Sequence, residues 1–482
     1  MPGVANVLGT LLAFFGIAYI VPVITSFIAG DGKAPLFLLA AAISSGSGFI
    51  VRLATRKHSR ELKPRDGFLL ATLSWVLMSL SASVPLLLAI PGISFTDAYF
   101  EAMSGLTTTG STILTGLDHL PASINIWRHT LHWLGGLGII VLAVAILPLL
   151  GVGGMQLYRA EAPGPVKDEK LTPRITETAK SLWVVYTVMT IAGIIALRFA
   201  GMTWFDAICH GMSALSLGGF STHDNSLGYY NSLAIELVMC VLMVLASLNF
   251  ARHFIALRRL TLQPYRKDPE ARAIGAVLGV SIIGITALLY FHGTYPDFGS
   301  ALRHATFNVI SMATTTGFVT ENFETWPAFA PIWLLFLTCI VCSTGSTGGG
   351  IKMFRTLLLA RQAGRELKLL VHPSAMWPVR IGGKPVPDHI GDSVLAFIFL
   401  YFMTVVTLTF AMLLTGLNFD SSFSAIVASI NNVGPTAASS PIHKPGSVPR
   451  RCWSDAWRSS ACSCSSLPPS GVNKKTWKSR TS

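Results

Sequence analysis

Four short segments of this sequence share one pattern, a semi-polar amphipathic stretch that ends at a glycine. Asp97 and Asp206 each lie thirteen residues before their glycine, and Ser104, Ser213 and Ser311 each lie six before theirs. One such segment would be an ordinary turn, but four in phase indicate an internal repeat. The segments read FTDAYFEAMSGLTTTGS to Gly110, WFDAICHGMSALSLGGF to Gly219, LRHATFNVISMATTTGF to Gly317 and FDSSFSAIVASINNVGP to Gly434.

The glycine ends of these segments have the composition of a site for a cation without its water shell. Such a cation needs a ring of oxygen ligands, and backbone carbonyls supply them without a fixed charge. Glycine permits the backbone angles that turn carbonyls inward, and Thr108, Thr109, Thr315 and Thr316 could add hydroxyls or pack behind. Because the glycine ends contain no carboxylate, the pattern disfavours an acidic ring selective for divalent ions.

The elements that must position these ends are membrane helices. Only 12% of the 482 residues are charged and 51% are hydrophobic, whereas soluble domains carry about 25% charged residues. Each half-helix before a glycine is too short to span a bilayer, so it must re-enter between spanning helices and line a cavity. We expect nine spanning stretches, near 7–28, 36–51, 69–90, 127–150, 182–199, 233–254, 274–291, 333–342 and 394–414.

The net charge of +13 could indicate a nucleic-acid-binding protein, but the positions of the basic residues argue against that interpretation. They gather in the loops 52–65, 159–174, 252–272 and 355–384, which fall on one side if the helices alternate. Basic short loops stay in the cytoplasm. The charge therefore indicates topology, and we expect no nucleic-acid partner.

The run CSTGSTGGGIKMFR interrupts the eighth stretch. Glycine costs a helix about 1 kcal/mol relative to alanine, so such a break is costly at membrane depth unless it serves the pore. A flexible loop below the filter would be a gate, and a cation on it could obstruct ion passage. The alternative is a cytoplasmic turn after a short helix. The predicted gate residues are Gly345, Gly348, Gly349, Gly350 and Lys352.

The repeats TTTGS, SLGGFSTHD, TTTGF and NNVGP, together with the glycine-rich run, resemble the TrkH/KtrB/HKT superfamily of potassium uptake proteins. The length, the two extra N-terminal helices and the loop YRAEAPGP resemble its bacterial TrkH branch. This resemblance implies that the glycine-rich run is a gate rather than a cytoplasmic turn. The resemblance implies an all-α integral membrane fold, with two N-terminal helices and four helix–pore loop–helix units around a central ion pore. Its filter would comprise Thr108, Thr109, Gly110, Leu217, Gly218, Gly219, Thr315, Thr316, Gly317, Asn432, Val433 and Gly434.

The same resemblance implies potassium uptake across the bacterial inner membrane. Relatives that admit sodium often have serine at the first filter glycine, so Gly110 favours potassium. The family works as a homodimer with a cytoplasmic nucleotide-binding ring of the TrkA type, which would be the partners besides membrane lipid. Potassium would be the transported ion at the filter, with no covalently bound cofactor and no enzymatic activity.

The expected domain order follows from the repeats. Residues 1–65 would hold the two extra helices and a basic loop. Repeats 1 to 3 would occupy 66–175, 176–270 and 271–385, the last with the gate. Residues 386–435 would form an incomplete fourth repeat, and 436–482 an aberrant tail.

The tail lacks the closing apolar helix that follows the first three filter glycines. The family has a final helix containing GRLEIF, whose arginine lies beneath the filter. For 452–471, permitted codons exist that read MLVGRLEIFSVLVLFTPAFW in a neighbouring frame. We therefore predict that the tail is out of frame, by sequencing error or mutation, and that the chain as written assembles poorly or leaks.

Several other readings remain open. The nearest is sodium-permeable transport on the same scaffold, and another is an inactive copy because of the altered C-terminus. A secondary transporter would more often show twofold inverted repeats. A membrane enzyme has little support, since the sequence contains no HExxH, Walker loop or paired intramembrane aspartates.

Other polar residues are assigned structural roles. We expect His129 and His132 to be interfacial anchors rather than metal ligands, and Glu236 and Asn249 to hydrogen-bond between helices. Asp97, Asp206 and Asp420 are predicted to cap the half-helices, although they could also attract cations to the mouth.

Overall fold

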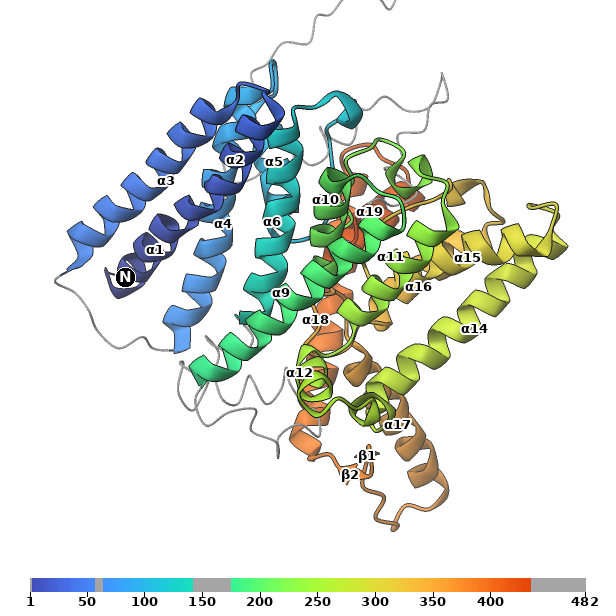
Figure 1. The fold of residues 1–482 in the computed structure, drawn as a ribbon. Helices are drawn as coiled ribbons and strands as arrows, with labels where there is room; N and C mark the ends of the chain where they lie inside the picture. Colours follow the sequence, from blue (N-terminus) through green and yellow to red (C-terminus); the bar gives the residue numbers. More distant parts are fainter. Residues whose placement is uncertain (1, 57–63, 142–174, 435–482) are drawn as a thin grey trace, which may run out of the picture.

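The computed structural model describes residues 2–56, 64–141 and 175–434. The predicted basic loop 159–174, the end of the fourth stretch and the aberrant tail lie outside the described residues. The described part is a helical body with one small two-stranded hairpin (Figure 1).

The N-terminal part and the first repeat contain the elements up to residue 141. They are α1 (Pro2–Phe15), η1 (Gly16–Tyr19), α2 (Ile20–Ala29), α3 (Ala34–Thr55), α4 (Pro64–Ala89), α5 (Phe95–Leu106), η3 (Leu117–His119) and α6 (Ala122–Val141). The second repeat contains α9 (Ile175–Phe199), α10 (Trp204–Ser216), η6 (Ser226–Tyr229), α11 (Leu233–Ser247), α12 (Phe250–Arg259) and α13 (Gln263–Arg266).

The third repeat contains α14 (Pro269–Phe291), α15 (Phe298–Ala313), η7 (Phe323–Thr325), α16 (Phe329–Ile340) and α17 (Met353–Val371). A hairpin of β1 (Arg380–Ile381) and β2 (Lys384–Pro385) follows, with Arg380 opposite Pro385. The described part of the fourth repeat is α18 (Asp388–Leu413) and α19 (Phe419–Asn431).

Within the described residues, six helical stretches are long and apolar enough to cross a membrane, and a bent pair makes up to seven. Each of the nine predicted stretches overlaps a helix, although only 127–141 of the fourth is described and α16 covers only 333–340 of the eighth. The sixth is wrong as a single helix, because α11 and α12 meet at an angle of 104°. Asn249 caps the start of α12, where its side chain accepts a hydrogen bond from the Ala251 N–H, in place of the expected bond between neighbouring helices.

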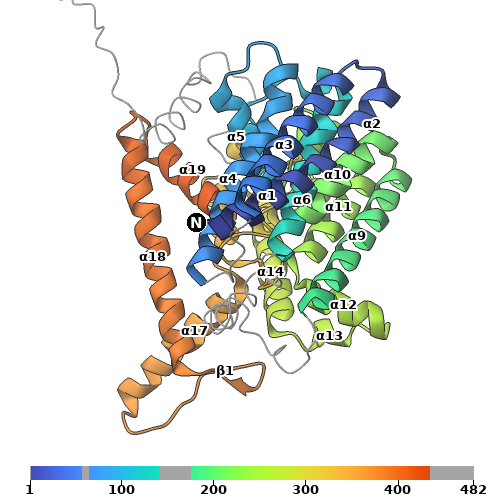
Figure 2. The ribbon, with the colours of Figure 1, turned by 90° about the vertical axis from the view of Figure 1, so that its left-hand side faces the viewer.

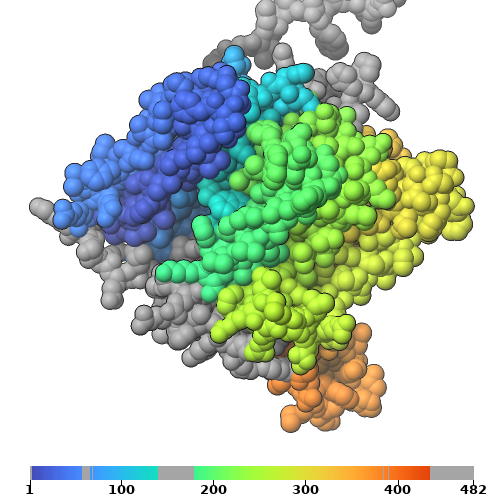
Figure 3. Space-filling model, in the orientation of Figure 1, coloured from blue at the N-terminus to red at the C-terminus, as the bar shows by residue number. Residues whose placement is uncertain are grey.

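The N-terminal helices pack against the first repeat rather than around the axis. Tyr19 stacks on Trp127 of α6 with 4.4 Å between ring centroids, and both side chains are fully buried. The Asp31 carboxylate accepts the N–H of Ser123 at the start of α6. These helices form one flank of the molecule (Figure 3).

The four half-helices α5, α10, α15 and α19 each follow a spanning helix. Side-chain oxygens cap their N-termini by accepting backbone N–H groups, and the caps are Ser94, Thr203, Asp297 and Asn418. The prediction that Asp97, Asp206 and Asp420 are the caps is therefore wrong. These aspartates lie inside the first turn, where their charge still favours the positive end of the helix dipole.

The basic segments α12, α13 and α17 lie at one end of the body, together with the β hairpin (Figures 1 and 2). The half-helices α5, α10 and α19 are placed toward the opposite end. This polarity agrees with basic loops on the cytoplasmic side.

Candidate functional site: four filter loops and a gating loop

The half-helices lead into four short segments, which we call filter loops 1 to 4 (residues 107–112, 217–222, 314–320 and 432–434). In each, the residue two before the glycine has a left-handed backbone, with φ of 60°, 56°, 61° and 60° at Thr108, Leu217, Thr315 and Asn432. The next residue donates its N–H to a carbonyl in the last helical turn at 2.9 Å in all four cases. These pairs are Thr109–Ser104, Gly218–Ser213, Thr316–Ser311 and Val433–Ala428.

This helix end is a Schellman motif, which normally places glycine at the left-handed position. Here the position holds two threonines, a leucine and an asparagine, so the backbone stores about 1–3 kcal/mol at each. The glycines that follow are left-handed at Gly110, Gly219 and Gly317, with φ of 80°, 79° and 87°. Gly434 departs from the other three, since its φ lies outside this left-handed range.

Consecutive filter loops touch through their backbones. A β-carbon on Gly110 would lie 1.8 Å from the carbonyl oxygen of Gly218, and one on Gly219 would lie 2.0 Å from that of Thr316. One on Gly434 would lie 2.7 Å from the carbonyl oxygen of Gly110. Loops 1, 2 and 3 are therefore neighbours in sequence order, and loop 4 returns to loop 1.

Side chains close the contact between the first and last loops. The Asn432 amide donates to the carbonyl of Thr107 at 2.8 Å and accepts from the Thr109 hydroxyl. Ser111 donates to the carbonyl of Gly434 at 3.2 Å. The predicted filter residues of all four repeats are thus brought together.

The glycine-rich break packs against filter loop 3 and against the junction of α19 with filter loop 4. We call residues 341–352, between α16 and α17, the gating loop. Gly349 donates its N–H to the Thr315 hydroxyl at 3.0 Å, and a β-carbon on Gly349 would lie 1.9 Å from the carbonyl oxygen of Asn431. The predicted interruption of the helix is confirmed, and the gating loop contacts the filter directly.

Four hydrogen bonds hold the first half of the gating loop. The buried Glu270 carboxylate accepts the N–H of Thr344 at 2.7 Å and the Ser343 hydroxyl at 2.9 Å. Ser343 N–H donates to Ser247 at 3.0 Å, and the Gly345 carbonyl accepts from Phe250 at 3.1 Å. The loop is therefore fastened to the break between α11 and α12.

The second half of the gating loop turns sharply. Gly350 has a φ of 75°, and a β-carbon there would lie 2.6 Å from the carbonyl oxygen of Thr338. Lys352 has the same φ of 75° without being glycine. Its ammonium donates to the Gly348 carbonyl, so the cation that we predicted at the gate is folded onto the loop itself.

Helix α6 forms a polar scaffold behind loops 1 and 2. Arg128 and Glu101 make an ion pair, with 2.7 Å between Nε and Oε1. His129 and His132 are fully buried, and His132 stacks on Phe220 with ring centroids 4.0 Å apart. The prediction of interfacial anchors is wrong, because these histidines contact filter loop 2 inside the protein.

A second ion pair joins helices farther from the filter glycines. Arg303 on α15 donates to both carboxylate oxygens of Glu236 on α11, at 2.9 and 2.7 Å. The expectation that Glu236 bonds between helices is confirmed.

The segments beyond loops 1 and 2 are joined to each other. The Asp224 carboxylate accepts the N–H groups of Gly116 and Leu117, and the His223 ring bonds to the Asp118 carboxylate. Burial raises the pKa of Asp118, but hydrogen bonds from His223 and from the Asp224 N–H outweigh it and hold that pKa below its ordinary value.

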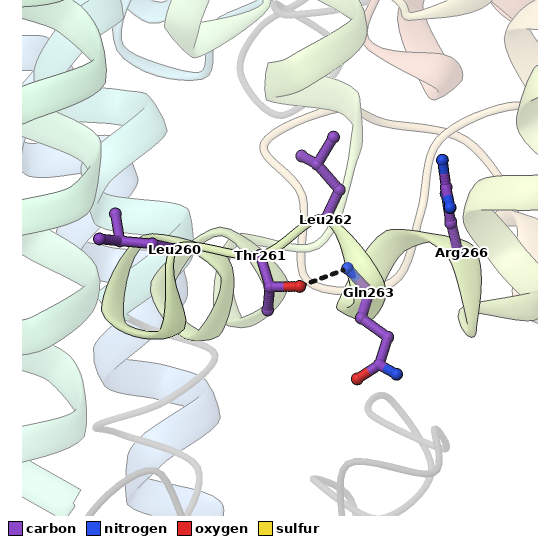
Figure 4. A pocket seen from close by; sticks show the side chains of 5 residues that line it. All are labelled: Leu260, Thr261, Leu262, Gln263 and Arg266. Carbon is purple, nitrogen blue, oxygen red and sulfur yellow. Dashed lines mark hydrogen bonds between the residues drawn. The ribbon is translucent and has the colours of Figure 1, made fainter.

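A surface pocket lies away from the filter, on the turn between α12 and α13 (Figure 4). The side chains of Leu260, Leu262, Gln263 and Arg266 point in different directions around it. Ligand sites have polar groups that converge, so the pocket is not part of the candidate site. Among the described residues, no group of three or more His, Cys, Asp or Glu side chains could hold a metal ion.

Sequence reasoning missed the contacts that assemble the filter. Nothing in the spacing of Glu101 and Arg128 signalled their pairing, since they lie on different helices. Asn432 offered a usable signal, because asparagine tolerates the left-handed conformation better than threonine or leucine does.

Comparisons with known proteins agree with this geometry. The family model for TrkH, described as "Cation transport protein", matches residues 35–444. The chain is 44% identical to the Trk system potassium uptake protein TrkH of Vibrio parahaemolyticus over 443 residues, 91% of each chain. It is 45% identical to TrkH of Halomonas elongata over the same length and share, and 42% identical to TrkH of Escherichia coli over 433 residues, 90% of each.

A solved structure has the same fold. The crystal structure of the potassium transporter TrkH from Vibrio parahaemolyticus superposes with a TM-score of 0.85, at 40% identity, covering 95% of each chain. The expected fold, a multi-pass helical membrane protein, is confirmed. Together, the family match and these relatives show that the chain belongs to the TrkH family of cation transport proteins.

Proposed function

We propose that this chain carries potassium into the bacterial cell across the inner membrane, through a channel-like pore lined by the four filter loops. The observation that carries the proposal is the ring itself. Four half-helices end in the same Schellman geometry, and their glycine loops touch in the order 1, 2, 3 and then 4 against 1. Four equivalent sets of backbone carbonyls around one axis are the ligands that a dehydrated monovalent cation requires.

The dipoles of the half-helices add an electrostatic field that favours a cation at the filter loops. Each points its C-terminus at its filter loop, and that end of a helix carries a partial negative charge. A cation held among the four loops gains from all four dipoles without meeting a fixed carboxylate. The residues that would donate carbonyls are those predicted from the sequence, from Thr108 to Gly110 in the first loop and their counterparts in the other three.

The gating loop controls passage below the filter. Its glycines pack against loops 3 and 4, and Lys352 adds a positive charge to the same segment. Moving the loop would alter both the width and the potential of the path. In this proposal potassium is the transported ion, and the chain uses no covalent cofactor and no catalytic step.

The quaternary organisation is proposed from the family resemblance. The chain would act as a homodimer in the lipid bilayer, regulated by a cytoplasmic nucleotide-binding ring of the TrkA type. The basic segments α12, α13 and α17 lie at the end of the molecule where such a ring would bind. No nucleic acid is involved.

Two chains test the proposal, the chain as written and a rebuilt chain in which residues 452–471 are replaced by MLVGRLEIFSVLVLFTPAFW and the residues after 471 are deleted. Both are expressed in a host that lacks potassium uptake, and growth on limiting potassium is measured with rubidium and sodium uptake. We expect the rebuilt chain to restore growth with potassium preferred over sodium, and the chain as written to restore it poorly. Equal uptake of both ions by the rebuilt chain would establish the sodium-permeable alternative instead.

A further inference from the structure

The ion pair of Glu101 and Arg128 is buried at a place where charges are costly. The side chains are 0% and 1% exposed, on the half-helix α5 and the spanning helix α6 of the first repeat. Taking two charges out of water costs several kcal/mol per ion unless every remaining polar atom is satisfied. The ion pair must therefore be stabilised by the other groups to which Glu101 and Arg128 are bonded.

Both members of the pair bind filter loop 1 beyond its glycine. The Thr112 hydroxyl donates to both Glu101 oxygens at 2.9 and 3.0 Å, and Ile113 donates its backbone N–H to Glu101 at 3.1 Å. One terminal amino group of Arg128 donates to the Thr112 oxygen at 3.1 Å. The segment two and three residues after Gly110 is thus fixed by charge-assisted bonds, which are the strong class of hydrogen bond.

Arg128 also reaches filter loop 2, which belongs to the next repeat. Its other amino group donates to the Ser221 carbonyl at 3.2 Å, and its guanidinium carbon lies 4.2 Å from the ring centroid of Phe220. Phe220 and Ser221 directly follow Gly219. One side chain therefore holds the outer ends of two adjacent filter loops, a task that the planar fork of arginine suits and a lysine does not.

We propose that Glu101 and Arg128 form a clamp that sets the separation of Gly110 and Gly219 and thereby the preference of the filter for potassium over sodium. They are positioning residues, which act on the ion only through the loops they hold. The inference rests on the proposed function, because it assumes that these loops bind the transported cation.

The test measures ion binding rather than transport, and it is run on both the chain as written and the rebuilt chain because the former is expected to assemble poorly. Purified protein in detergent is heated in potassium chloride or in sodium chloride over a range of concentrations, and the apparent Tm is followed by the loss of the monodisperse species. A bound ion stabilises the folded state by an amount that grows with the logarithm of its concentration relative to its Kd, so each titration gives a Kd and the two together give the ratio of affinities.

Charge-conserving variants separate geometry from charge. R128K and E101D keep both charges but shorten or reshape the clamp. We expect each to lower the potassium-to-sodium affinity ratio about tenfold, the worth of one hydrogen bond to a charged group. R303K and E236D make the same changes in the ion pair between α15 and α11 and should leave the ratio unchanged, even where they lower the apparent Tm.

Two milder variants, T112V and T112S, test the clamp if R128K does not fold. T112V removes only the hydroxyl shared by Glu101 and Arg128 and should lower the ratio, whereas T112S keeps the hydroxyl and should restore it. The clamp is refuted if R128K, E101D and T112V keep the ratio of the unmodified chain, or if R303K and E236D lower it equally. If potassium stabilises neither the chain as written nor the rebuilt chain, then the proposed filter fails, and the clamp proposal with it.

Discussion

The carbonyl oxygen of Gly218 lies 1.8 Å from the position that a β-carbon on Gly110 would occupy. The two residues belong to different repeats, so this approach is a contact between neighbouring filter loops. A substitution at Gly110 must move either its own loop or that of the next repeat.

We therefore expect G110A to disturb the filter more than a strained backbone alone would. Gly110 has a φ of 80°, and a side chain there costs about 1–2 kcal/mol before any collision is counted. The control is G92A, since Gly92 has a φ of 77° with nothing within 4 Å of its β-position. The potassium-to-sodium affinity ratio should fall in G110A and stay unchanged in G92A. Equal ratios in both variants would show that loops 1 and 2 tolerate separation.

The pair of Asp118 and His223 predicts how stability depends on pH at the outer ends of loops 1 and 2. The pKa of Asp118 in the folded chain lies below its ordinary value of 3.8. A lowered carboxyl pKa contributes stability that is complete above the ordinary value and is lost as the pH falls through the folded value.

D118N should accordingly lower the free energy of unfolding at pH 7 by about 1 kcal/mol or less, because the carboxylate is partly exposed and screened. Its apparent Tm should also fall less than that of the unmodified chain when the pH is lowered from about 5 to about 3. D392N, on the exposed face of α18, serves as the control. Parallel pH profiles for D118N and the unmodified chain would contradict the assignment.

The sequence predicted the elements of this protein better than their contacts. Apolar stretches and in-phase glycines revealed the spans, the half-helices and the break at Gly345–Gly350, because each is encoded locally. The bend at Asn249 was missed, since the apolar pattern continues through it and two of the bonds at the turn, from Phe250 to the Gly345 carbonyl and from Ser343 to the Ser247 carbonyl, join residues that are distant in sequence.

The capping residues show the same limit at shorter range. Asp206 stands at a conspicuous fixed distance from its glycine, yet Thr203 accepts the backbone N–H of Asp206 itself. The spacing correctly located the first turn of the half-helix, but it identified the wrong residue of that turn as the cap. The left-handed Leu217 carried no sequence signal at all, because only the contacts of the assembled ring compensate its strain.

Gly349 provides a prediction for the gating loop. A β-carbon there would lie 1.9 Å from the carbonyl oxygen of Asn431 and 3.1 Å from the Asn432 side chain. We expect G349A to push the gating loop away from filter loop 4 and to raise the basal rubidium flux of the rebuilt chain in proteoliposomes.

The control for this change is G364A, within α17, where the β-position has nothing within 4 Å. Alanine in a helix interior is favoured over glycine by about 1 kcal/mol, so G364A should hold or raise the apparent Tm without changing the flux. A G349A chain with normal basal flux and an unchanged Tm would mean that the contact with Asn431 yields easily.

The last prediction concerns Glu270, which fastens the gating loop to the start of α14. Replacing it with alanine leaves the Thr344 N–H and the Ser343 hydroxyl without this acceptor, and a buried unsatisfied group costs about 1–3 kcal/mol. Since the folded loop loses that energy, its population of displaced states should rise by roughly ten- to a hundredfold. E270A should therefore leak rubidium in the rebuilt chain, whereas E270Q, whose amide oxygen can still accept the Thr344 N–H, should leak far less. A leak of equal size in both variants would assign the effect to the lost charge, and no leak in either would show that Ser247 and Phe250 hold the loop without Glu270.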